Sequence, residues 1–398
     1  MSEVTASRRA APVLLAYGFR PFFLLCGASA ALLIAAWMGV MFAGLALPLG
    51  VSPPAWHAHE MLFGVVPAAI AGFLLTAVPN WTGAAPLAGR GLGALLVLWL
   101  AGRIAMATGA WLPALLVAIA DLAFLTVLAG YIARVLLRHG NHRNLVLPAV
   151  LLTLAFANLG SHLSFAGIWP AGTQFGQVLA LDLIAVLMLV IGGRITPAFT
   201  ANWLRQHGRD ASCVVTSPVL DRVALLSAAL VVVADLFTAW PAAGALTAGV
   251  AALANGWRLC RWRGWIATRE PLLWVLHLGI AWVVIALALK ALTPLLTLPA
   301  SVWMHALGAG AAGTLLLGVM TRVALGHTGR ALQLPRGAIC IYLLVILAAM
   351  ARLAASLHPD AYRALLMLSA FAWIGAFVLF LLYFTPVLAR PRPDGRAG

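Results

Sequence analysis

Long apolar runs separated by short breaks make up almost the whole chain, and most charged residues lie in the breaks. A run of about 20 apolar residues is long enough to cross a bilayer as an α-helix. Windows of that length predict twelve membrane-spanning helices, with little room to turn at Trp240-Pro241 between the seventh and the eighth. The predicted spans are 22–47, 58–79, 92–111, 113–137, 144–167, 174–196, 219–240, 241–257, 270–292, 301–321, 337–357 and 363–388.

The composition supports a membrane fold. Hydrophobic residues fill 64% of the 398 positions and charged residues 9%, whereas about a quarter of the residues in a soluble protein are charged. We therefore expect an all-α polytopic membrane protein with a single transmembrane domain over residues 1–398, including a cytoplasmic N-terminal segment 1–21 and a cytoplasmic tail 389–398. The first apolar run is too long for the core of a signal peptide, so we expect it to remain as a helix.

The basic residues orient the chain in the bilayer. The net charge of +15 comes from 25 Lys and Arg against ten acids, but these bases lie in short breaks between spans and not in a soluble patch, so we expect no nucleic-acid partner. A cytoplasmic N-terminus places most of them inside, as the positive-inside rule requires, and both termini are then cytoplasmic. The bases left at or near the outer side are Arg103, Lys290, Arg352 and Arg363.

Two histidines and a glutamate stand where the second span enters the membrane, in Trp56-His57-Ala58-His59-Glu60. Ionisable groups at membrane depth are costly and usually mark a site for ions, protons or a cofactor. The alternative is an interfacial cap that satisfies the free backbone groups of the helix start. His57 and His59 diverge by about 200° on an ideal helix, so they cannot both bind one metal unless the helix begins after them.

Two other histidines lie at similar depth. His162 and His305 lie within or at the mouth of apolar spans near the outer face, and His277 lies inside the ninth span near its inner end, whereas His139 and His142 look like loop residues. Imidazole binds haem iron, copper and zinc. A haem held by two histidines from the second and tenth spans fits this layout, with a second metal or a proton relay nearby; an ion or solute path is the cofactor-free alternative.

Three acids, Asp121, Asp182 and Asp235, map to the outer halves of spans four, six and seven. They are candidates for a proton path or for stabilising a cation. Pairing with Arg103 or with helix-end amides is the alternative. The sequence leaves both open.

A weak internal repeat relates three spans. An offset of 246 residues brings His59 onto His305 and Gly64 onto Gly310, and an offset of 122 brings Glu60 onto Asp182. Spans two, six and ten would then be equivalent helices of three four-helix units around a pseudo-threefold axis, since internal repeats are common in polytopic proteins.

The inner ends of these three spans carry Pro, Gly and hydrogen-bond donors. Pro and Gly interrupt helices, and Arg194 and Arg322 supply donors for a carboxylate or a haem propionate. His327 is the best ligand candidate on the inner side. Helix capping with positive-inside anchoring is the alternative.

Several stretches resemble one family. The segments His57–Gly64 and Leu74–Gly83, with Gly193–Asn202 and Arg322–Arg330, are similar to the hallmark stretches of the NnrS family. The resemblance implies a twelve-helix protein of the bacterial inner membrane that binds haem and copper and is linked to the response to nitric oxide. Haem-copper oxidases and nitric oxide reductases share only the architecture: they hold haem through histidines of the second and tenth helices, but the sixth and seventh spans here contain no histidine for their copper site.

These observations lead to one main hypothesis. A haem b would be held by His305 with His57 or His59, and copper by His162 with the other histidine, His277 being a further metal candidate; Glu60 would orient a ligand or move protons. The protein would handle nitric oxide as an oxidoreductase fed by a respiratory electron donor, or as a protective binder. The alternatives are a transporter of a metal or small solute and an assembly protein of a respiratory complex.

Overall fold

The computed structural model describes residues 12–237 and 241–396, which fold into helices without a strand. The α-helices, with π-helical turns η2 and η6, are α1 (Phe19–Phe42), α2 (Pro53–His59), η2 (Glu60–Val65), α3 (Val66–Thr82), α4 (Gly89–Ala107), α5 (Ala114–Arg138), α6 (Val146–Phe165), α7 (Gly172–Gln206), α8 (Pro218–Leu236), α9 (Pro241–Arg261), α10 (Pro271–Leu292), α11 (Ser301–His305), η6 (Ala306–Ala312), α12 (Gly313–His327), α13 (Ile339–Leu357) and α14 (Tyr362–Ala389). Short 3₁₀ turns are η1 (Val13–Leu15), η3 (Gly109–Trp111), η4 (His142–Asn144), η5 (Gly264–Ala267) and η7 (Pro359–Ala361).

The fold confirms the all-α polytopic membrane protein. In the described residues ten helices are long and apolar enough to cross a membrane, where α2, η2 and α3 form one continuous span and α11, η6 and α12 form another. The predicted seventh and eighth spans are also helical, as α8 and α9, but they are not among the ten; α8 carries Asp221, Arg222 and Asp235. The predicted turn at Trp240 lies outside the described residues.

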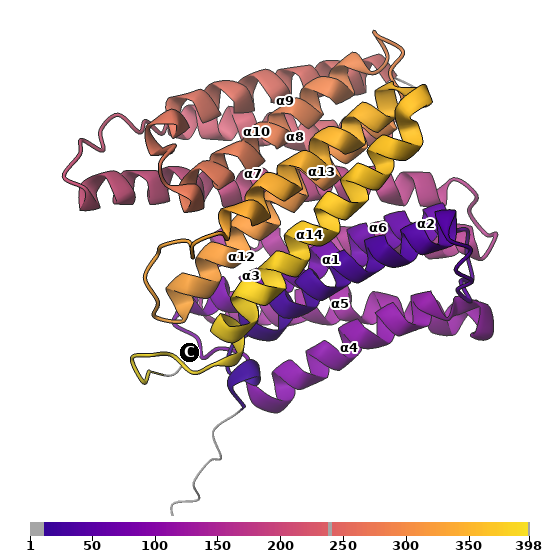
Figure 1. The fold of residues 1–398 in the computed structure, drawn as a ribbon, viewed down its shortest axis with the longest axis horizontal. Coiled ribbons are helices and arrows are strands. Elements are labelled where there is room, and N and C mark those ends of the chain that lie inside the picture. Colours follow the sequence, from indigo (N-terminus) through magenta and orange to yellow (C-terminus); the bar gives the residue numbers. More distant parts are fainter. Residues whose placement is uncertain (1–11, 238–240, 397–398) are drawn as a thin grey trace, which may run out of the picture.

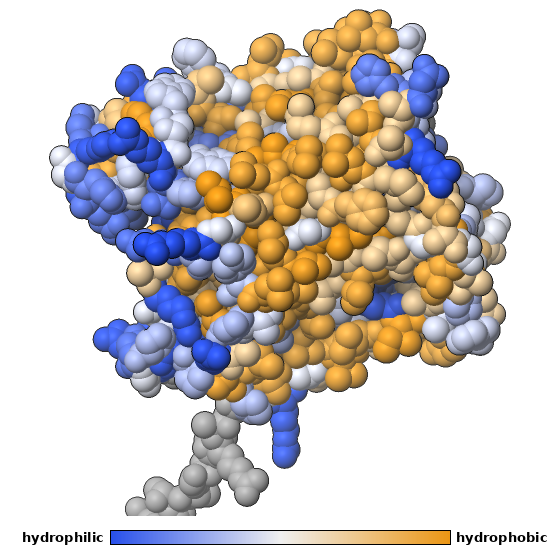
Figure 2. Space-filling view, viewed as in Figure 1, coloured by the Kyte–Doolittle hydropathy of each residue, from blue (hydrophilic) through white to orange (hydrophobic). Residues whose placement is uncertain are grey.

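The helices pack in sequence order into a closed bundle. Neighbours along the chain pack on each other from α4 to α7 and from α8 to α10, and α14 packs against both α13 and α1 (Figure 1). In the space-filling view a hydrophobic band crosses the molecule, and hydrophilic residues gather at its two ends, most densely at the end that holds the C-terminus (Figure 2). This distribution matches a bundle that spans a bilayer.

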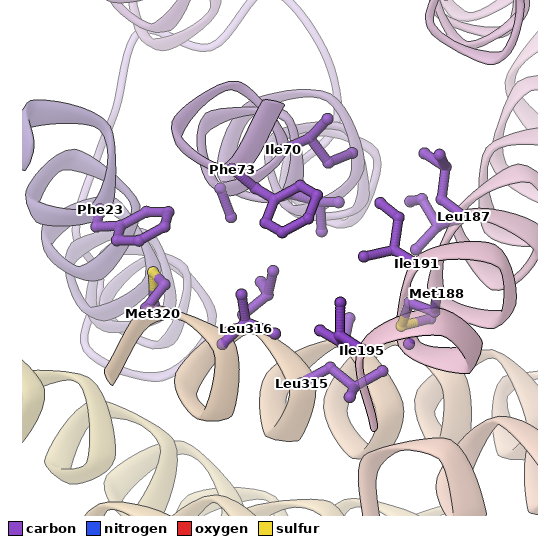
Figure 3. A pocket seen from close by; sticks show the side chains of 16 residues that line it. Phe23, Ile70, Phe73, Leu187, Met188, Ile191, Ile195, Leu315, Leu316 and Met320 are labelled. Atoms are coloured by element: carbon purple, nitrogen blue, oxygen red, sulfur yellow. The ribbon is translucent and has the colours of Figure 1, made fainter. Parts of the chain in front are cut away.

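Spans two, six and ten meet in the interior. A cavity of about 90 Å³ is lined only by apolar side chains and glycine, and Phe73 of α3, Ile191 of α7 and Leu316 of α12 all contribute to it (Figure 3). The second span is the most buried of the ten. The three helices that the internal repeat relates therefore share the apolar centre of the bundle.

The repeat also has a local structural counterpart. The π-helical turns begin at Glu60 and Ala306, which the offset of 246 residues superimposes, immediately after His59 and His305. Gly64 and Gly310, also paired by this offset, lie within these turns. π-Helical turns are rare and frequently mark functional sites, so both histidines stand next to an irregularity of that kind.

Candidate functional site

A buried polar network links η2, α4, α5 and α6 around one arginine. Arg103 of α4 forms ion pairs with Glu60 and with Asp121. Gly64 makes this approach possible, because a Cβ there would lie 2.6 Å from the Arg103 Nη1 atom. Asp121 is therefore paired with Arg103. The sequence had left open whether this acid pairs with Arg103 or belongs to a proton path.

The second oxygen of Asp121 accepts two further hydrogen bonds. Asn158 Nδ2 donates to Asp121 Oδ2 at 2.6 Å, and His162 Nε2 lies 2.9 Å from the same oxygen. Asn158 and His162 both come from α6 and are buried. The carboxylate thus has partners at both of its oxygens, as a buried charge requires.

His59 lies in this network with both ring nitrogens facing acceptors. Its Nδ1 is 3.3 Å from Glu60 Oε1, and its Nε2 is 2.8 Å from Asn158 Oδ1 and 3.1 Å from Asp121 Oδ2. A neutral imidazole can donate only one hydrogen bond, so this geometry favours the imidazolium form. Two cations, Arg103 and His59, then balance the two carboxylates.

Three of these residues form a candidate metal site. His59, Asp121 and His162 each offer a ligand atom, and these atoms lie within 4.8 Å of one another. Two imidazoles and a carboxylate suit copper or zinc. Both ring nitrogens of His59 face oxygen atoms, so a metal ion bound to one of them would take the place of the proton on that nitrogen.

His57 faces a different place from His59. It lines a cavity of about 400 Å³ together with His305, and the other lining side chains are mainly apolar, among them Trp37, Met304 and Trp373. The cavity has the size of a small-molecule site. It lies between the second and tenth spans, which the sequence proposed as the helices that hold haem.

The hydrogen bonds of the two cavity histidines leave ligand atoms available. His305 Nδ1 lies 2.7 Å from the Ser301 carbonyl oxygen, to which it donates, and this contact leaves Nε2 as the basic nitrogen. Metal-binding histidines usually have such a partner. The His57 ring stacks on Trp37 with 4.5 Å between centroids, and its buried Nδ1 has no hydrogen-bond partner among the described residues.

Arg352 of α13 is a cavity residue that the sequence hypothesis did not include. It lines the cavity beside the two histidines and donates to Ser356 Oγ at 2.7 Å, but forms no ion pair within the described part of the chain. Its position outside the breaks predicted to be cytoplasmic was the signal that could have identified it. A guanidinium facing an apolar cavity favours a ligand with an acidic group.

The remaining candidates lie away from both places. His277 bonds to Thr200 Oγ1 at 2.9 Å, Arg194 donates to Asn144 Oδ1 at 2.9 Å, and the Arg322 guanidinium lies 4.2 Å from the centroid of the Phe199 ring. The His327 ring packs on Phe19 with 5.8 Å between centroids. Each of the four has its own local partner, and none lines the cavity that holds His57 and His305.

The fold, the polar network around Arg103 and the cavity that holds His57 and His305 define a polytopic helical membrane protein with a histidine–carboxylate network and a separate histidine-lined cavity. Residues 13–392 match the NnrS protein family. Since the match covers nearly the whole chain, the protein belongs to that family. The search of curated proteins found no match.

Proposed function

We propose that the protein binds haem and copper in the membrane and handles nitric oxide. The observation that carries the proposal is the cavity of about 400 Å³ that His57 of the second span shares with His305 of the tenth. Membership of the NnrS family supports the link to nitric oxide.

The cavity residues fit a haem b. His305 would be the fixed ligand of the haem iron, because its Nδ1 is anchored on the Ser301 carbonyl and its Nε2 is left basic. His57 has no such anchor and would be the exchangeable ligand. Arg352 would pair with a propionate, a role that the sequence hypothesis gave to Arg194 and Arg322.

The polar network fits a copper ion. His59, Asp121 and His162 would supply its ligands, and Glu60 would keep His59 oriented through its contact with Nδ1. The sequence hypothesis also gave copper to His162, together with whichever of His57 and His59 does not hold haem. His277 is not needed in this assignment.

Bound haem would supply an iron able to bind nitric oxide, and the chain's own residues would determine access to it. Beside a haem whose propionate pairs with Arg352, the mainly apolar lining would favour a small uncharged gas over a polar solute. If the protein reduces nitric oxide, electrons would come from a respiratory donor. If it only binds nitric oxide protectively, no electrons are needed. The basic end of the bundle would face the cytoplasm of a bacterial inner membrane, with both termini there.

Purified protein tests the assignment directly. The His305→Ala variant should lose the haem Soret band, while the loop variant His139→Ala, our matched control, should keep it. An unchanged spectrum in His305→Ala would refute the haem assignment. Wild-type protein that is colourless and free of metal would favour the transporter alternative.

A further inference from the structure

A second buried ionic cluster lies behind the cavity, separate from the Arg103 network. The Lys290 ammonium of α10 lies 2.5 Å from Asp182 Oδ1 of α7 and also forms an ion pair with Asp235 of α8. It lies 4.3 Å from the centroid of the Trp303 ring. The side chains of Lys290, Asp182 and Asp235 are 9%, 4% and 18% exposed.

The charges of this cluster do not balance if both carboxyl groups are ionised. One ammonium then faces two carboxylates, which leaves a net negative charge at membrane depth, where unpaired charge is costly. On the neighbouring helices, Arg258 of α9 pairs with Asp221 of α8, with 2.6 Å between Nε and Oδ1, and Arg222 of α8 donates to the Pro218 carbonyl oxygen. Within the described residues no second cation compensates the pair.

One carboxyl oxygen of this cluster lacks a hydrogen-bond partner, as expected if a proton belongs there. Asp182 Oδ2 is buried and has no hydrogen-bond partner in the described part of the chain. Two carboxyl oxygens and the face of the Trp303 ring surround the Lys290 ammonium. Carboxyl groups that share one site cannot both ionise easily.

We propose that Asp182 and Asp235 share one proton and form a protonatable site behind the cavity wall. Leu181, the neighbour of Asp182, lines the cavity, and so does Met304, the neighbour of Trp303. A proton held here can be released or taken up when the charge of the cavity contents changes. The proposal does not depend on haem or copper being those contents.

Infrared spectroscopy of the purified protein in liposomes at neutral pH tests the proposal. Wild type should show the C=O band of a protonated carboxylic acid, which shifts in heavy water. Asp182→Asn and Asp235→Asn should each lose this band, because each leaves one carboxylate paired with Lys290. Loss in only one variant also supports the proposal and assigns the proton to that carboxyl group.

Two further variants complete the test. Asp221→Asn, whose carboxyl group has a one-to-one partner in Arg258, should keep the band. Lys290→Met should strengthen it, because both carboxyl groups are then neutral. No such band in wild type, or a band that persists in both Asp182→Asn and Asp235→Asn, would overturn the proposal. The readout needs no metal, so its failure is distinguishable from failure of the haem assignment.

Discussion

His57 and His59 stand two residues apart on one helix, yet they face different sites. His57 lines the cavity with His305, whereas His59 lies in the ionic network of Arg103, Glu60 and Asp121. Both belong to α2, so the helix does not begin after them. The helical geometry had left two possibilities, and the structure selects the one in which the two histidines have different partners.

Replacing Arg103 should destabilise the protein strongly. Arg103→Met leaves Glu60 and Asp121 buried without their shared cation, and breaking a buried ion pair costs about 3–5 kcal/mol. We expect a lower midpoint of thermal unfolding in detergent. Arg363→Met, at a basic residue that lies over the Phe42 ring and forms no ion pair in the described residues, is the control. Equal midpoints for both variants would contradict the account of the network.

Gly64 should tolerate no side chain. A Cβ at this position would lie 2.6 Å from Arg103 Nη1 and 3.1 Å from its Cδ, so Gly64→Ala has to displace the guanidinium from its two carboxylates. Overpacking of this kind costs about 1–3 kcal/mol. Gly130→Ala, where a Cβ meets nothing within 4 Å, should leave the unfolding midpoint unchanged. Similar midpoints for the two variants would show that Gly64 does not position Arg103.

Arg352 should contribute to ligand affinity more than to folding. Arg352→Gln removes the charge that we assign to a propionate, and a hydrogen bond to a charged group contributes about 1.5–3 kcal/mol, so haem affinity should fall roughly tenfold or more. Arg352→Lys should restore part of it. The measurement is haem transfer to an acceptor protein. Unchanged transfer in Arg352→Gln would remove the residue from the site.

Copper content should depend on the polar network and not on the cavity. His162→Ala removes one ligand of the His59–Asp121–His162 cluster, so copper in the purified protein should fall while haem is retained. His305→Ala should give the opposite pattern. Metal analysis of the two variants side by side measures both. Loss of both metals in both folded variants would contradict two separate sites.

Much of the fold follows from hydropathy alone. The apolar runs predicted the position of each helix, because a bilayer forces each run into a helix of sufficient length, but α7 continues to Gln206, well beyond the predicted end at residue 196, and α8 and α9 are not among the ten helices long and apolar enough to cross a membrane. The π-helical turns at Glu60 and Ala306 were not predictable, since one extra residue in a turn does not alter the composition of a span. The charged residues of α8 lower its hydropathy. Asp221 pairs with Arg258 and Asp235 with Lys290 in the folded protein, and these pairings between different helices cannot be read from the sequence.

The candidate site was predicted in part. The sequence identified His57, His59, His162 and His305, but which of them share a site depends on the direction of each side chain. Asn158 carried no signal, because a lone amide in an apolar span has many possible partners. The pairing of Asp182 with Lys290, 108 residues apart in the chain, also emerges only from the packing of α7 on α10.

The optical spectrum and metal content of purified wild-type protein, before and after nitric oxide is added, test the central claim most directly. We predict a haem spectrum that nitric oxide changes, with copper present, and a Soret band that is absent from His305→Ala and retained in His139→Ala. Wild-type protein with neither haem nor copper, or a His305→Ala variant with an unchanged Soret band, would contradict the account.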